Sequence, residues 1–201
     1  MIIKDIESLR NIYGQPSERA LKKTQFRLDN HSTNFINKSP FVLISTINKL
    51  GKMDVSPRGG QPGFIHILDD NTFLIPDAKG NNRLDSLENI VETGHFGALF
   101  LIPGIDETLR LNGSAKVSTS PDLLLHFSNE RIPVKTVIVV TVEETFMHCA
   151  KAFMRSKLWE MDAQLTRSEF PTMGQILKDQ IGGNEIPEKH SDMVERYKKD
   201  I

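Results

Sequence analysis

The chain has 201 residues, of which 38% are hydrophobic and 25% charged, a composition typical of one globular domain with a substantial core. Its net charge of −1 provides no basic field for nucleic acid and no polybasic patch for a membrane, so we expect neither partner. The single cysteine, Cys149, excludes an internal disulfide and a multi-cysteine zinc site, and we expect it to be small and buried. The N-terminus lacks an apolar signal core and no apolar run is long enough to span a membrane, which predicts a cytoplasmic protein.

Residues 1–38 predict helices that cover the rest of the domain. Apolar residues recur at helical spacing over Asp5–Tyr13, and Gly14 and Pro16 follow. Ser17 is a suitable N-cap for a second short helix. A third helix is expected over Asp29–Lys38. We interpret this segment as a helical cover of a single domain, residues 1–201.

The pattern changes to strands at residue 41, and residues 39–146 predict a barrel. β-branched and apolar runs alternate with short turns, among them Asp69–Asn71 between two strands. Because the connections are too short for repeated crossovers, the strands are expected to be antiparallel. The fold class is therefore mainly β, a closed or split β-barrel with Greek-key connections and helical additions. The expected strands are Phe41–Ile47, Met53–Ser56, Gly63–Leu68, Thr72–Ile75, Phe96–Ile102, Glu107–Val117 and Thr136–Val142.

Helices are expected inside and after the barrel. Arg83–Glu92 places its apolar residues on one helical face, which inserts a helix after the fourth strand. Pro121–Phe127 is a short helix. Residues 147–201 form a helical C-terminal segment, with a polar and partly frayed end from residue 182. Its expected helices are Ala150–Asp162, Thr172–Gln180 and Asp192–Tyr197.

Two glycine-rich, cationic stretches are the most informative feature of the chain. They are Met53–Gly60 and Asp77–Arg83, and each is interpreted as a loop after a strand-like run. Two such loops that converge would offer backbone N–H groups and guanidinium groups to one anion, most simply a phosphate. The sequence therefore predicts a site for a phosphorylated cofactor.

Arg58 and the start of the inserted helix are the main candidates within these stretches. Pro57 precedes Arg58 and two glycines follow it, so a ligand could approach the backbone closely; the alternative is a surface arginine in a hairpin loop. Asn82, Arg83 and Ser86 lie where the uncapped N–H groups and dipole of a helix favour an anion, and the alternative is helix capping. Lys79 leads into this helix.

Other polar residues have weaker patterns. Arg110 and Asn112 share one strand face, which meets either solvent or a cleft between subunits. Trp159 lies four residues after Arg155 on the expected helix, where it either anchors the helix on the barrel or reaches a ligand, including one across a subunit interface. The six histidines have no metal-ligand spacing, so no metal is expected, and no residue can be assigned a catalytic role.

Three segments resemble the pyridoxamine 5′-phosphate oxidase-related family of flavin-binding split barrels. They are Asp54–Gly59, Asn81–Ile90 and Pro103–Gly113, and His148–Trp159 resembles an uncharacterised branch of that family. The resemblance implies a homodimer with two FMN sites between the subunits; FAD is less expected because no adenosine-binding element is visible. The chain departs from the pattern of true pyridoxamine-phosphate oxidases at Ser86, where a lysine is usual, and at its C-terminal end.

The resemblance implies distinct roles for the candidate residues. Ser56, Pro57 and Arg58 would line the flavin, and Asn82, Arg83 and Ser86 would hold the phosphate. Ile75 and Pro76 would contact the isoalloxazine through their backbone, while Arg110, Asn112 and Trp159 would come from a neighbouring strand or the partner chain. The implied function is an FMN-dependent oxidoreductase acting on an unidentified small molecule. The alternatives are a non-catalytic flavin carrier and a haem-binding split barrel, for which no histidine is singled out.

Overall fold

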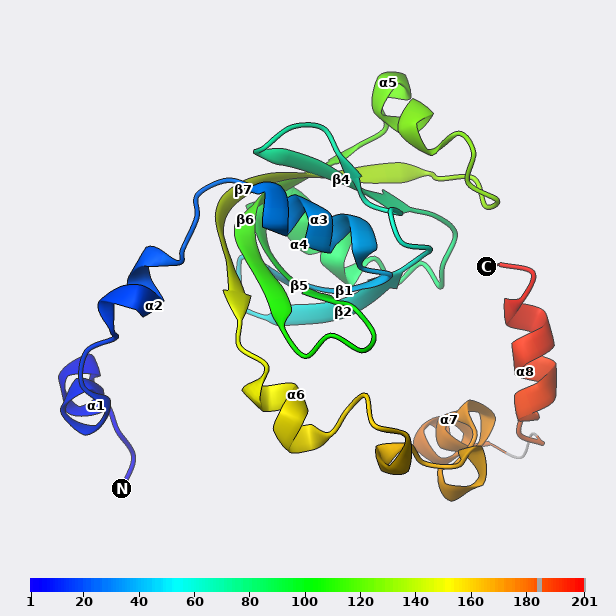
Figure 1. Ribbon diagram of the computed structural model, residues 1–201. Coiled ribbons are helices and arrows are strands. Elements are labelled where there is room, and N and C mark those ends of the chain that lie inside the picture. Colours follow the sequence, from blue (N-terminus) through cyan, green and yellow to red (C-terminus); the bar gives the residue numbers. More distant parts are fainter. Residues whose placement is uncertain (184–185, 201) are drawn as a thin grey trace.

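The computed structural model describes residues 1–183 and 186–200 and contains one seven-stranded antiparallel sheet (Figure 1). The strand order is β2-β1-β5-β6-β7-β4-β3, so β2 and β3 are the two edges. The helix α4 (Asp85–Thr93) is inserted after the fourth strand, as predicted. The mainly β split barrel with helical additions is thereby confirmed. The strands are β1 (Phe41–Ile47), β2 (Met53–Gly59), β3 (His66–Ile67), β4 (Thr72–Asp77), β5 (His95–Leu101), β6 (Thr108–Ser118) and β7 (Thr136–His148).

The core lies on the concave side of this sheet and follows the period-two pattern of the strands. Val42 and Ile44 of β1 and Phe100 of β5 are completely buried, while the residues between them are partly exposed. The strands β6 and β7 shift register at Gly113. A Cβ atom at this glycine would lie 2.0 Å from the carbonyl oxygen of Thr141, so no other residue fits the bulge without moving the backbone.

Two helices close the barrel. The helix α3 (Asn30–Lys38) buries Phe35 and Ile36 against the core, and its N-cap Asp29 accepts a hydrogen bond from the Ser32 amide. The helix α4 buries Ile90 and ties itself to β1 through the side chain of Asn89, which donates to the Thr46 hydroxyl. A small second core under α5 (Pro121–Leu124) and the turn Leu125–Phe127 contains Phe127.

The remaining helices bury no side chain. Figure 1 shows α1 and α2 extending from one side of the barrel and α6 to α8 following its other side. Of the expected N-terminal cover, residues 1–38, the helix α3 and the preceding Leu28 pack on the core. These terminal helices are α1 (Ile6–Tyr13), α2 (Glu18–Lys22), α6 (Lys151–Ser156), α7 (Met173–Ile181) and α8 (His190–Tyr197), with short 3₁₀ turns at Met161–Ala163 and Arg167–Glu169.

Several sequence-based boundaries were wrong. The strand β2 continues to Gly59, because pairing with β1 extends to Phe41, so Arg58 lies in a strand and not in a loop. The expected strand Gly63–Leu68 is reduced to two residues, although the hairpin across Asp69–Asn71 is confirmed. The helix α6 ends at Ser156 because Lys157 adopts a left-handed conformation. Arg155 and Trp159 therefore do not share a helical face.

Two further observations concern Cys149 and membranes. Cys149 is exposed, contrary to the prediction that it is buried, because it follows the end of β7 where the chain leaves the barrel. Among the described residues, no helix combines the length and apolar character required to cross a bilayer.

Candidate functional site

A cleft of about 1620 Å³ is lined by residues of the edge strand β2 and of the end of β4 with the segment that follows it. The strand β2 contributes Asp54 and the run from Ser56 to Gly59, and the end of β4 with its connection to α4 contributes Pro76 to Asp85. The start of β7 and the end of α8 complete the wall. The two glycine-rich, cationic stretches therefore converge on one cavity, although one of them is a strand.

Arg58 and Asp77 connect the two sides of this cleft. Their side chains approach to 3.5 Å, between Nη2 and Oδ1, and are 24% and 19% exposed. Burial raises the pKa of the Asp77 carboxyl, and the charges of Arg58 and Lys135 oppose this shift. Nη1 of Arg58 donates to the carbonyl of Pro57, while its Nε is buried without a hydrogen-bond partner. A buried guanidinium with an unused donor is suited to a polar ligand.

Asp54 was not singled out from the sequence, yet it organises the wall next to α4. Its Oδ2 accepts hydrogen bonds from the hydroxyls of Ser56, at 3.0 Å, and Ser86, at 2.6 Å. Ser86 is 3% exposed, so its hydroxyl is held by the carboxylate. Alternation along β2 could have identified this residue, because Asp54, Ser56 and Arg58 share one face of the strand.

The N-terminus of α4 opens into the cleft without a side-chain cap. Its N-cap residue, Leu84, has a positive φ of 59° and makes no capping hydrogen bond, and Asn82 has a φ of 61°. Left-handed conformations at two non-glycine residues are unfavourable, and such residues concentrate at ligand sites. Arg83 is exposed and its Nε donates to Asp85 at 2.9 Å, which raises the pKa of Arg83 and lowers that of Asp85. This combination of free N–H groups, helix dipole and guanidinium suits an anion.

The C-terminal helix is also part of the cleft, which the sequence did not indicate. Arg196 and Tyr197 of α8 line it together with Asp200, whose carboxylate lies 3.6 Å from the ammonium of Lys79. Arg196 is held by two hydrogen bonds to Glu188. The polar C-terminal segment thus contributes a wall that no local sequence motif predicted.

Four of the candidate residues lie outside the cleft. Ile75 is completely buried in the core, with its neighbour Pro76 at the cleft. Arg110 and Asn112 both donate to Oε1 of Glu144, at 3.1 and 3.2 Å, on the outward face of the sheet. Within one chain these two residues do not meet Arg58. Any role at the same ligand requires a second chain.

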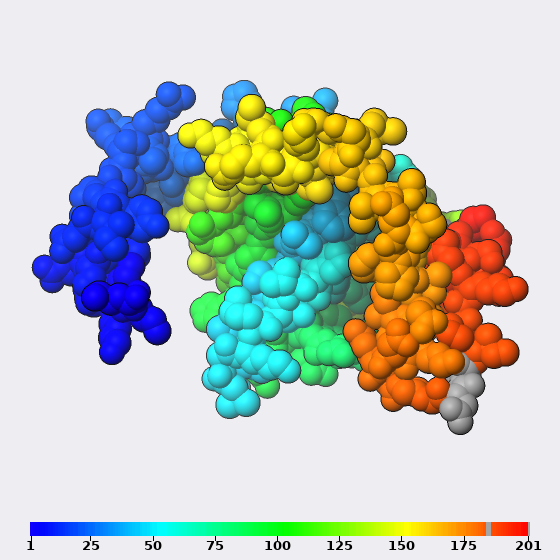
Figure 2. Space-filling view, turned by 90° about the horizontal axis from the view of Figure 1, so that it is seen from below, coloured from blue at the N-terminus to red at the C-terminus, as the bar shows by residue number. Residues whose placement is uncertain are grey.

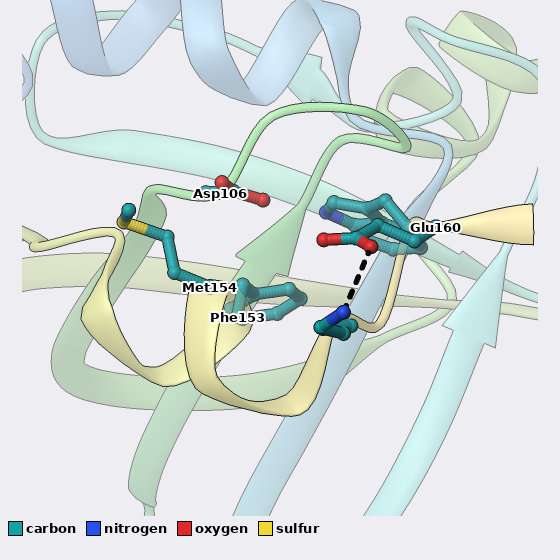
Figure 3. Close-up of a pocket in the computed structure, with 6 residues that line it drawn as sticks. Asp106, Phe153, Met154 and Glu160 are labelled. Carbon is teal, nitrogen blue, oxygen red and sulfur yellow. Dashed lines mark ion pairs between the residues drawn. The ribbon is translucent and has the colours of Figure 1, made fainter. Parts of the chain in front are cut away.

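Trp159, the fourth, lines a separate small pocket of about 240 Å³ (Figure 3). Its indole N–H donates to the carbonyl of Ile105 at 3.0 Å, and its ring stacks on Phe153 with centroids 5.4 Å apart. Beside it, Lys157 and Glu160 form an ion pair across 3.6 Å, drawn as the dashed line in Figure 3. These contacts match the anchoring role that the sequence left open for this tryptophan.

No metal centre accompanies the cleft: within residues 1–183 and 186–200, no group of three or more His, Cys, Asp or Glu residues is arranged to hold an ion. The stacked pair of His66 and His126, with ring centroids 4.1 Å apart, contains too few ligands. The polar groups that line the cleft are guanidinium, ammonium, amide, hydroxyl and carboxylate groups.

A protein-family model and several solved structures are similar to this chain. The profile described as pyridoxamine 5′-phosphate oxidase matches residues 28–149. Among solved structures, HupZ from Group A Streptococcus has 18% identity and a TM-score of 0.50, covering 60% of this chain and 93% of its own. A putative pyridoxamine 5′-phosphate oxidase from Lactobacillus delbrueckii has 19% identity and a TM-score of 0.48, covering 60% of this chain and 93% of its own. No curated protein matches the sequence significantly.

Proposed function

Because the chain belongs to the pyridoxamine 5′-phosphate oxidase family, we propose that it binds FMN in the large cleft and acts as an FMN-dependent oxidoreductase on a small molecule. The observation that carries this proposal is the convergence on one cleft of Arg58 and the uncapped start of α4. The cleft volume of about 1620 Å³ exceeds the roughly 300–1,000 Å³ of common ligand sites, which leaves room for a substrate beside the cofactor.

The residues around α4 fit the phosphate. Leu84 leaves the first N–H groups of the helix without a side-chain acceptor, and Arg83 adds an exposed cation. Asn82, which also lines the cleft, provides a further amide. Ser86 donates its hydroxyl to Asp54, so its contribution to a phosphate requires that hydroxyl to turn. Lys79 is shared with Asp200 and is a weaker candidate.

The residues of β2 and β4 fit the ring system. Arg58, with its unused Nε donor, lines the cleft from β2, and Pro76 lines it from β4. Ser56 is held in place by Asp54. When bound, FMN supplies hydride or electron transfer, so the site requires few side chains for chemistry. Arg58 places a fixed positive charge in the cleft and Asp77 limits its movement.

The remaining candidates support a homodimer as part of the proposal. Arg110 and Asn112 lie on the outward face of the sheet, away from the cleft of their own chain. On the same face, Val55 and Met53 of β2 are 62% and 59% exposed. Apolar side chains gathered on an open sheet face favour a partner surface. A second copy docked there would bring its own polar residues near the flavin, as the family resemblance implies.

A flavin carrier without turnover and a haem protein are the alternatives. Among the described residues that line the cleft, there is no His, Cys or Met, and Tyr197 is the only residue of a type that commonly ligates haem iron. This lining disfavours haem. The carrier differs from the enzyme only in turnover, because it would have the same cleft.

The test is a titration of the purified full chain. We expect visible flavin absorption in the purified protein, or quenching of FMN fluorescence with saturation at one FMN per chain. Haemin in parallel should produce no sharp Soret shift. Absence of flavin absorption together with absence of FMN binding would refute the proposal. FMN binding without reduction by NADH or NADPH, and without reoxidation by any acceptor tested, would favour the carrier.

A further inference from the structure

The N-terminal arm, residues 1–22, carries an apolar face that its own chain leaves uncovered. Ile6, Ile12 and Tyr13 of α1 are 76%, 64% and 77% exposed. Leu9, which is 41% exposed, joins them into one side of the helix, because it lies three residues from Ile6 and three and four residues from Ile12 and Tyr13. An isolated helix of eight residues is unstable in water, so packing against another surface is required to maintain it.

The arm is attached to the barrel only at its end. The hydrogen bonds and ion pairs described for residues 1–22 stay within the arm or reach Lys23 and Thr24 at its end. From Lys23 onward the chain is fixed: the Lys23 ammonium donates to the carbonyl of Met147, and Gln25 pairs with Thr145 of β7. The start of the arm is therefore set by β7, while its helices project beyond the barrel.

The arm stands beside an exposed sheet face. Figure 2 shows the blue N-terminal arm on one side and the orange C-terminal segment on the other, with the cyan and green surface of the barrel between them. Phe41, Val55 and Met53 of β1 and β2 point outward on this sheet and are 37%, 62% and 59% exposed. The chain thus carries two apolar surfaces, the sheet face and the projecting helix α1, and α1 buries neither itself nor the sheet.

The solvent-accessible area of the chain indicates how much surface a partner could bury. The chain exposes 14261 Å². A compact chain of 22.7 kDa exposes about 9,500 Å² by the usual scaling, so the excess is about 4,700 Å². Obligate homodimers bury about 2,000–5,000 Å² or more in total. The excess is thus sufficient for a dimer interface that includes the arms as well as the sheet.

We propose that a second copy of this chain covers the exposed sheet face, and that residues 1–22 of each chain clasp the other. The inference rests on the homodimer included in the proposed function and assigns its main contact to α1. A twofold axis satisfies both arms at once, because the same patch, sheet face plus helix, is present on each chain. The contact is apolar at Ile6, Leu9 and Ile12, and the opposite side of α1, with Glu7 and Asn11, stays in solvent.

Neighbouring substitutions in α1 test the clasp. Ile12→Asp places a charge on the apolar side, and Asn11→Asp places the same charge on the polar side. We expect Ile12→Asp to raise the dimer dissociation constant at least tenfold by sedimentation equilibrium, with Asn11→Asp within twofold of the original chain. Neither change should alter the unfolding midpoint of the monomer in urea, because α1 buries no side chain in its own chain.

Cross-linking of mixed light and heavy chains identifies the surface that the arm contacts. We expect lysine cross-links from Lys4 or Lys22 to barrel lysines such as Lys49 to join a light to a heavy chain. Cross-links within one chain would overturn the clasp, as would a dimer unaffected by Ile12→Asp or a monomer that co-sediments with anionic vesicles. FMN is titrated into the same samples. If the chain is a monomer that binds FMN, the dimer and the clasp are refuted and FMN binding stands. If the chain is a clasped dimer that does not bind FMN, only the FMN proposal is refuted.

Discussion

Replacing Arg83 by alanine provides the clearest test of the phosphate site. Its guanidinium is 75% exposed and touches one carboxylate, that of Asp85. Because an ion pair this exposed adds little to stability, its loss should leave the fold intact. A charge-assisted hydrogen bond to a phosphate contributes roughly 1.5–3 kcal/mol. Most of this contribution remains after the exposed pair with Asp85 is given up, so we expect FMN binding to become at least tenfold weaker.

The assay compares two ligands and two variants. FMN and riboflavin are titrated by flavin fluorescence, because riboflavin lacks the phosphate. Arg83→Ala should weaken FMN binding and leave riboflavin binding within twofold of the original. Arg27→Ala is the matched control: Arg27 is 72% exposed, pairs with Asp70 at 3.2 Å and lies away from the cleft. Unchanged FMN affinity, or an equal loss for both ligands, would refute the assignment of Arg83 to the phosphate.

Three further predictions concern the pH dependence of stability, the buried core and Trp159. Burial and the neighbouring His126 lower the pKa of His66, so the unfolded chain binds the proton more tightly; stability should fall as pH decreases below about 6.5, and His126→Gln should reduce that dependence in thermal melts at pH 7.5 and 5.5. Phe100→Ala, at a completely buried position, should lower the free energy of unfolding in urea by about 3–5 kcal/mol, and a loss under 1 kcal/mol would contradict the assigned core. Trp159→Phe should leave FMN affinity within twofold, since its indole is used at Ile105; a tenfold loss would place it at a flavin.

The sequence was most informative where a residue's environment is decided by its close neighbours. The β-branched, largely apolar run of β1 and the alternating apolar residues of β6 predicted strands, because both patterns depend only on near neighbours in the chain. The turn at Asp69–Asn71 and the inserted helix α4 depend on local turn chemistry and helical spacing. The expected helix Ala150–Asp162 failed because its end depends on the left-handed Lys157 and on the docking of Trp159 near Ile105, which is distant in sequence.

The candidate site was partly predictable for the same reason. Arg58 and Arg83 were identified from glycine and proline neighbours and from a helix start. Asp77 and Asp54 were missed as site residues because their importance comes from contacts across strands, to Arg58 and to Ser86. A short stretch of sequence does not indicate which distant side chain a residue will contact after folding.

The sequence by itself determined the mainly β barrel, the position of the inserted helix and the two cationic stretches, because each depends on periodicity or turn residues within a short window. Only the tertiary structure decided that both stretches line one cleft and that α8 forms part of its wall. It also separated Arg110, Asn112 and Trp159 from that cleft and left the face of α1 uncovered. These outcomes depend on how the sheet curls and where the terminal segments return, and those are properties of long-range packing.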